Sequence, residues 1–225
     1  PQIHIPKCNI NLKLYYKANG FYTVEESILS LEKKETDIDV LKKERGYFEG
    51  YWQSFQYVQK VESELRRRFR FINKDDKKLS DIAKEIHKQN AVSIHIRRGD
   101  YLTSQTQRIF GNICTDEYYK KAIDYIEKAI EKPVYYYFSN DINWVKEKYK
   151  RNNAIYVNQD LFDDYEDWYD MYLMSVCKHN IIANSTFSWW GAWLNQNQNK
   201  VVIAPSKWVN GCKYEDIYPS AWIRL

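Results

Sequence analysis

Residues 92–101 read Val-Ser-Ile-His-Ile-Arg-Arg-Gly-Asp-Tyr, and this stretch decides the fold of the chain. β-branched residues occupy positions 92, 94 and 96, which is the alternation of a buried strand. Two arginines follow at once, and Gly99 then allows a sharp turn. Ligands of α/β proteins bind in the crevice beyond the carboxyl ends of parallel strands. The stretch therefore predicts a core strand that delivers cations to a ligand site.

Two other interpretations of the same residues are weaker. The pair Arg97-Arg98 could be a solvated surface loop, but the preceding strand and the following Gly-Asp favour a binding site. Arg98-Gly99-Asp100 also spells an adhesion tripeptide. Adhesion needs a protruding, mobile loop, and a tripeptide that directly follows a core strand is poorly placed for it.

The composition indicates a soluble globular protein. The chain has 225 residues, 44% hydrophobic and 28% charged, enough for one large or two small domains. A net charge of +4 argues against a dedicated nucleic-acid binder. The only dense basic run, 66–70, is best explained as a solvated helix face, with an anionic-surface patch as the alternative. Four dispersed cysteines and four dispersed histidines give no support to a zinc site or a disulfide framework.

Strands and helices alternate from residue 91 onward. The pattern predicts strands over 91–96, 134–138, 154–157, 180–183 and 201–204. It predicts helices over 115–131 and 164–176, one that follows the 139–141 tip and runs through Trp144 to Tyr149, and one that follows the 184–188 tip and runs through Trp190 to Asn195. This alternation is typical of a doubly wound parallel sheet, so the expected fold class is α/β and Rossmann-like. Earlier in the chain we predict an aromatic turn at 46–52 and helical segments near 55–65 and 81–89. The predicted domain boundary separates 1–85 from 86–225.

Three predicted strand tips carry unusual polar groups, at 95–100, 139–141 and 184–188. The tips of parallel strands meet at one edge of a sheet, so these groups should converge. Ser185 and Thr186 open a helix whose N-terminus would suit a phosphate, although simple N-capping explains them too. The 139–141 tip could accept hydrogen bonds from guanine, or be only a turn and helix cap. Together the tips predict a nucleoside diphosphate site. The chain has no P-loop and no Asp-x-Asp pair, so arginines in place of a metal would neutralise the diphosphate.

The motifs at the strand tips carry a family resemblance. Residues 95–101 and 184–194 strongly resemble the α-1,2-fucosyltransferases of glycosyltransferase family 11, and 138–141 and 46–52 are similar to stretches of that family. The resemblance implies a GT-B-like fold with a GDP-fucose-binding domain at 86–225. Residues 1–85 would form a partial, acceptor-side N-terminal domain, because the family's Gly-rich first βα turn is absent.

The activity implied by the resemblance is the inverting transfer of fucose from GDP-β-L-fucose to the 2-hydroxyl of a terminal galactose on a glycan. No cofactor and no metal would be needed. The partners would be GDP-fucose and a galactose-terminated acceptor, without nucleic acid and without stable membrane insertion; the oligomeric state stays open. The alternative is a non-catalytic module that binds GDP-sugars or glycans. The composition and the lack of a membrane anchor indicate a bacterial cytoplasmic enzyme, with peripheral membrane association as a variant of that expectation.

The resemblance also assigns roles to individual residues. Arg97 would bind the diphosphate, and Arg98 would support the loop. The remaining donor-binding residues would face the nucleoside or the phosphates: His95, Asn140, Asp141, Ser185, Thr186, Phe187 and Ser188. Asp100 is the candidate base for the acceptor hydroxyl. The competing interpretation, weighted about equally, is that Asp100 pairs with an arginine and fixes the loop.

Overall fold

The computed structural model describes residues 22–25, 46–49, 53–71, 76–102, 104–211 and 215–225. Within these ranges the side chains at 22–25, 46–49, 100, 102, 104 and 105 lie outside the description. In the part of the chain that the structure describes, no helix is long and apolar enough to cross a membrane.

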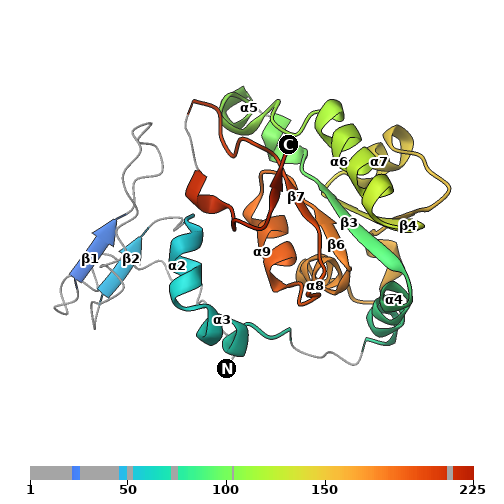
Figure 1. Cartoon of the computed structure of the whole chain (residues 1–225), viewed down its shortest axis with the longest axis horizontal. Helices are drawn as coiled ribbons and strands as arrows, with labels where there is room; N and C mark the ends of the chain where they lie inside the picture. The colour runs from blue at the N-terminus through green and yellow to red at the C-terminus, as the bar shows by residue number, and fades with distance from the viewer. Residues whose placement is uncertain (1–21, 26–45, 50–52, 72–75, 103, 212–214) are drawn as a thin grey trace.

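A six-stranded parallel sheet forms the centre of the molecule (Figure 1). Its strands run in the spatial order β5-β4-β3-β6-β7-β8. Their bounds are β3 Asn90–Ile96, β4 Pro133–Ser139, β5 Ala154–Tyr156, β6 His179–Ile181, β7 Val202–Ala204 and β8 Ile223–Arg224. From β3 the chain first adds β4 and β5 on one side, then crosses to add β6, β7 and β8 on the other. The predicted Rossmann-like, doubly wound sheet is confirmed, and its topological switch point lies between β3 and β6.

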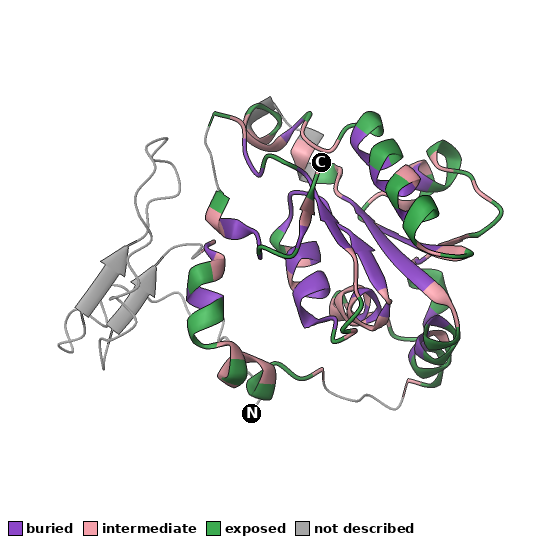
Figure 2. Ribbon diagram, in the orientation of Figure 1, coloured by how far each residue is buried: buried purple, intermediate pink, exposed green. Residues whose placement is uncertain are grey.

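Helices cover both faces of this sheet. They are α4 Lys77–Lys88, α5 Ser104–Phe110, α6 Asp116–Ala129, α7 Ile142–Lys148, α8 Trp168–Val176 and α9 Thr186–Leu194. The alternation in β3 separates the two cores: Val92 and Ile94 pack with α6 and α7, whereas Ala91 packs with α4 and α8. Figure 2 shows the central strands of the sheet largely buried and the outer faces of the helices exposed. Burial on both faces explains why β4 carries an unbroken run of large apolar side chains, Val134 to Phe138.

Two short helices precede the sheet, α2 Phe55–Lys60 and α3 Glu62–Arg68, where helical spacing was predicted. They dock on α9: the rings of Phe55 and Trp189 are 6.4 Å apart, and the guanidinium carbon of Arg66 lies 4.0 Å from the ring centroid of Trp193. Further along the basic run, Arg67 pairs with Glu64 on an exposed face. The run is therefore a solvated helix face, apart from Arg66.

Three short elements differ from the sequence-based expectation. Residues Gly46–Glu49 form a strand, β2, parallel to β1 at Tyr22–Glu25, where a turn was predicted. The aromatic segment is extended because β1 supplies its parallel hydrogen-bonding partner. The local sequence of 46–49 carries no signal for a partner that lies so far away in the chain. Helix α5 replaces part of a predicted loop. Strand β8 has only two residues, too few for any periodicity.

Candidate functional site

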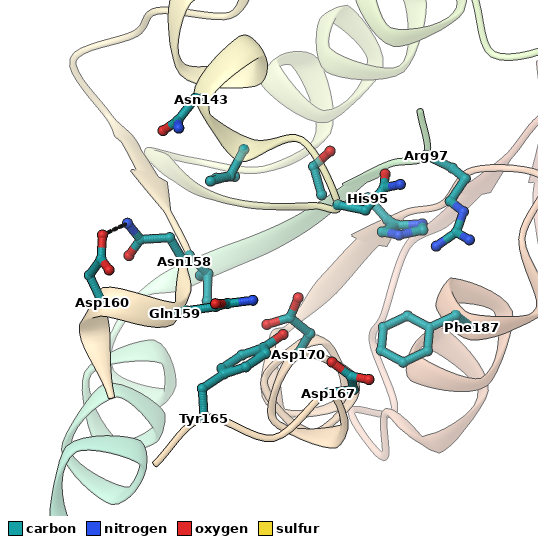
Figure 3. A pocket seen from close by; sticks show the side chains of 14 residues that line it. His95, Arg97, Asn143, Asn158, Gln159, Asp160, Tyr165, Asp167, Asp170 and Phe187 are labelled. Atoms are coloured by element: carbon teal, nitrogen blue, oxygen red, sulfur yellow. Dashed lines mark hydrogen bonds between the residues drawn. The ribbon is translucent and has the colours of Figure 1, made fainter. Parts of the chain in front are cut away.

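The three polar strand tips meet as predicted. β4, β3 and β6 are neighbours in the sheet, so their carboxyl ends lie side by side at the switch point. A pocket of about 500 Å³ opens there, lined by the tips of β3, β4 and β5 and by the first turns of α7, α8 and α9 (Figure 3). His95 in β3, Arg97 and Asn140 directly after β3 and β4, and Phe187 in α9 all line it. Figure 3 shows the side chains of His95, Arg97 and Phe187 close together on one side.

The turn after β3 depends on Gly99 and Asn140. Gly99 has a φ of +32°, a conformation that L side chains rarely adopt, and the Asn140 amide occupies the space that a Cβ would fill. The Asn140 Oδ1 accepts a hydrogen bond of 3.0 Å from the backbone N–H of Arg98. The tips of β3 and β4 are thereby fixed to each other, with Arg97 lining the pocket.

Arg98 and Asp141 form a separate, structural pair. The Arg98 Nε donates to the Asp141 Oδ2 at 3.1 Å, and its guanidinium carbon lies 3.5 Å from the Trp144 ring centroid. Asp141 also caps α7, because its Oδ1 accepts from the Trp144 N–H. Neither residue lines the pocket. The support that Arg98 gives to the loop thus has a clear geometry, while donor contact by Arg98 and Asp141 stays a prediction.

The third tip begins α9. Thr186 is the first helical residue, and the Ser185 side chain forms no capping bond. The N–H groups of the first turn lack intrahelical acceptors and carry the positive end of the helix dipole. Phe187 faces the pocket, whereas the Ser188 hydroxyl is buried and donates to the carbonyl oxygen of Ser185 at 3.2 Å. A ligand contact from Ser188 stays a prediction.

The opposite side of the pocket is acidic, and sequence analysis did not single it out. Asp170 in α8 lines the pocket, and its Oδ1 is buried without a hydrogen-bond partner among the described residues. Burial raises the pKa of Asp170 to about 7; the Tyr165 hydroxyl opposes this shift, and the charge of Asp167 adds to it. Figure 3 shows Tyr165, Asp167 and Asp170 facing His95 and Arg97. The pocket therefore has one cationic and one acidic side.

His95 lies within the same pocket, 4% exposed. Its Nδ1 has no hydrogen-bond partner among the described residues. Burial, with a smaller contribution from the Arg97 charge, lowers the pKa of His95 to about 3. The imidazole is therefore neutral at physiological pH and offers an uncharged nitrogen to a ligand.

Asp100 lies in the 3₁₀ turn Gly99–Leu102, but its side chain lies outside the described part of the chain. Its role as a base stays a prediction. Within the described residues, no group of three or more His, Cys, Asp or Glu side chains could hold a metal ion. The expectation of a metal-free reaction is a prediction as well.

The sheet topology and the pocket define an α/β protein with a polar ligand site at its switch point. Sequence comparison identifies its family. The profile of Glycosyl transferase family 11 matches residues 10–225, and the chain belongs to that family. Family membership confirms the resemblance drawn from the two motifs.

Several curated proteins are similar to the chain. An alpha-1,2-colitosyltransferase of Escherichia coli is 39% identical over 185 residues, which cover 79% of this chain and 62% of that protein. The O-antigen biosynthesis glycosyltransferase WbnK of Escherichia coli is 43% identical over 136 residues, 60% of this chain and 45% of that protein. Human galactoside alpha-(1,2)-fucosyltransferase 1 is 32% identical over 103 residues, 46% of this chain and 28% of that protein. The chain thus spans less than two thirds of each of these relatives.

Proposed function

We propose that the protein is an inverting, metal-independent α-1,2-fucosyltransferase that moves fucose from GDP-β-L-fucose to the 2-hydroxyl of a terminal galactose. The observation that carries the proposal is the opposed charge of the two pocket sides, with Arg97 and the start of α9 on one side and Asp170 on the other. A nucleoside diphosphate has the matching polarity, an anion at one end and hydrogen-bond donors at the other.

The acidic side suits guanine. An ionised carboxylate only accepts hydrogen bonds, and the adjacent N1–H and N2–H₂ groups of guanine can donate to it together. Adenine and uracil present no such adjacent pair of donors. The unpartnered Asp170 Oδ1 would gain these bonds, and the His95 Nδ1 would offer a further contact to the nucleoside. A buried polar atom left without a partner is costly, so the guanine base would stabilise the site.

The cationic side suits the diphosphate. The guanidinium of Arg97 can bind phosphate oxygens through two parallel N–H groups, and the amides at the start of α9 add a second anion site. In the reaction, the bond between fucose C1 and the β-phosphate oxygen breaks while the acceptor O2 bonds to C1 from the opposite face. Arg97 and α9 would stabilise the departing GDP. The acceptor proton would pass to a base, for which Asp100 is the candidate.

A second donor sugar has specific support. The match to the colitosyltransferase covers 79% of the chain, and that protein is named for the transfer of colitose in place of fucose. Transfer of colitose from a GDP-activated donor would use the same base and diphosphate contacts. Only the part of the pocket around the sugar would distinguish the two donors.

Calorimetric titration with GDP in the presence of EDTA tests the donor site, with UDP and ADP as controls. We expect selective binding of GDP. Arg97→Ala should lower the affinity by at least tenfold, because hydrogen bonds to charged groups contribute roughly 1.5–3 kcal/mol each. Arg108→Ala, an exposed arginine of α5, is the matched control and should bind as the unaltered protein does.

A transfer assay then tests the reaction. GDP-fucose and GDP-colitose are each offered with galactose-terminated acceptors, and the new linkage is assigned by NMR. Transfer to the 2-hydroxyl in EDTA supports the proposal. Selective GDP binding without any transfer favours the non-catalytic binding module, and absence of selective GDP binding contradicts the proposed donor.

A further inference from the structure

One side chain, Tyr101, links the two loops of the cationic side. Its hydroxyl donates a hydrogen bond of 2.8 Å to the backbone carbonyl of Asn184, directly before the N-cap of α9. Its own backbone N–H donates to the Arg98 carbonyl at 2.7 Å and closes the turn after β3. Tyr101 therefore connects loops that follow neighbouring strands on either side of the switch point.

The Asn184 end of this link is firmly held. Asn184 is 3% exposed, and its Nδ2 donates to the carbonyls of Phe110 and Trp208, each at 3.1 Å. The thiol of Cys114 donates to the Asn184 Oδ1 at 3.4 Å. With both of its amide atoms bonded in this way, Asn184 is a fixed point from which Tyr101 can position the other loop.

The Tyr101 ring connects the same link to Arg97. It stacks on Phe110 with the centroids 5.1 Å apart and the planes 17° apart. The guanidinium carbon of Arg97 lies 5.8 Å from the Tyr101 ring centroid, within cation–π range. A shift of the ring would therefore move the surface over which Arg97 lies.

We propose that Tyr101 is a positioning residue that sets the spacing between Arg97 and the amides at the start of α9, so that both reach one diphosphate. The inference rests on the proposed function, because it assumes that the two groups share this ligand. Tyr101 would contact no substrate itself and would act through Arg97 and Asn184.

The test compares Tyr101→Phe with a matched control, Tyr156→Phe. The Tyr156 hydroxyl makes the same kind of bond, 2.7 Å to the Tyr149 carbonyl, but joins β5 to the end of α7. GDP titration gives Kd for each variant, and urea unfolding gives its stability. A purely structural loss lowers stability but leaves the Kd of the folded molecules unchanged.

We expect Tyr101→Phe to raise Kd about fivefold and Tyr101→Ala to raise it further, since the latter also removes the surface beneath Arg97. Tyr156→Phe should keep the Kd of the unaltered protein even if it unfolds at a lower urea concentration. An unchanged Kd in Tyr101→Phe, with GDP still bound by the unaltered protein, overturns the inference alone. If the unaltered protein does not bind GDP, the proposed donor fails and the inference fails with it.

Discussion

An ionised carboxylate at Asp170 destabilises the empty protein, and under the proposed function it would stabilise the bound base. Its pKa in the folded state, about 7, lies above the unfolded value of 3.8 because of burial. Protonation is thus favoured by folding, and the stability it provides is complete below about pH 4 and lost as the pH rises to 7. A rise of about three pKa units corresponds to on the order of 4 kcal/mol. Asp170→Asn should therefore raise the free energy of unfolding at pH 8 by up to about this amount and have little effect at pH 4. Urea unfolding at the two pH values measures this difference.

The same residue predicts a pH dependence of binding. In the proposed donor site guanine would donate to the ionised carboxylate, so the affinity for GDP should fall as the pH drops below about 7, approaching tenfold for each further pH unit. Calorimetric titration from pH 5 to 8 measures it. Asp170→Asn should bind GDP weakly and without this pH dependence. A variant that binds as tightly as the unaltered protein at pH 8 would exclude Asp170 from the base site.

Gly99 is the residue at which the β3 turn tolerates least change. An alanine there has an unfavourable positive φ, and its Cβ collides with the Asn140 amide. We expect Gly99→Ala to lower the free energy of unfolding by about 1–3 kcal/mol. Adding Asn140→Ala removes the collision but not the backbone strain. The free energy of unfolding of the double variant should therefore fall by less than the sum of the decreases in the two single variants. Strict additivity in urea unfolding would contradict the role of Asn140 as the filler of this space.

At the scale of elements, α8 and α9 approach each other closely at one glycine. A Cβ on Gly191 would lie 2.9 Å from the Met174 Cβ and 3.1 Å from its sulfur. Gly191→Ala should push α9 away and lower the free energy of unfolding by about 1–3 kcal/mol. Met174→Ala opens a space there, so a double-mutant cycle should show a favourable coupling energy above about 0.5 kcal/mol. A coupling energy near zero would mean that the helices adjust elsewhere.

The strands and helices after residue 90 were largely predictable, because each carries its own local signal. β3 shows the alternation of a buried strand, and α6 is preceded by the N-cap Thr115, whose side chain accepts from the Tyr118 N–H. Strand β8 and the pairing of β2 with β1 were not predictable. They depend on a partner distant in sequence, and neither short segment shows a periodicity.

Half of the candidate site was predictable for the same reason. Arg97, Asn140 and Phe187 follow or flank recognisable strands, and the parallel topology alone brings them to one edge. Asp170 was missed since it lies within a run of acidic residues, 163–170, where nothing local marks one carboxylate as buried. The end of β5 was predictable in principle, because the carboxyl ends of parallel strands lie at the same edge of a sheet. This end contributes Asn158 to the pocket.

At the scale of the whole molecule, Arg66 holds the α2–α3 segment against α9. Its two terminal nitrogens lie 3.4 Å from the Trp193 carbonyl oxygen, and its guanidinium covers the Trp193 ring. Arg66→Met should let this segment open more often, by about fivefold for a loss of about 1 kcal/mol. The rate of tryptic cleavage at Arg68 and Arg70 reports this opening.

Arg67→Met is the matched control for this measurement. Arg67 is exposed and pairs only locally, with Glu64, and exposed pairs of this kind contribute little to stability. Its substitution removes one tryptic site just as Arg66→Met does. Equal cleavage rates in the two variants would show that the segment is held by its aromatic contacts alone.

The pocket has walls from the ends of three strands, β3, β4 and β5, and from the starts of three helices, α7, α8 and α9, spread over residues 95–187. None of these segments holds a ligand by itself, so occupancy requires that the strands have assembled in the right order. Titration with a ligand of this pocket would therefore count native molecules during refolding. A collapsed chain whose helices have formed but whose β6 is misplaced would give a normal far-ultraviolet circular dichroism spectrum. It would nevertheless bind no ligand, so the titration would not count it as native.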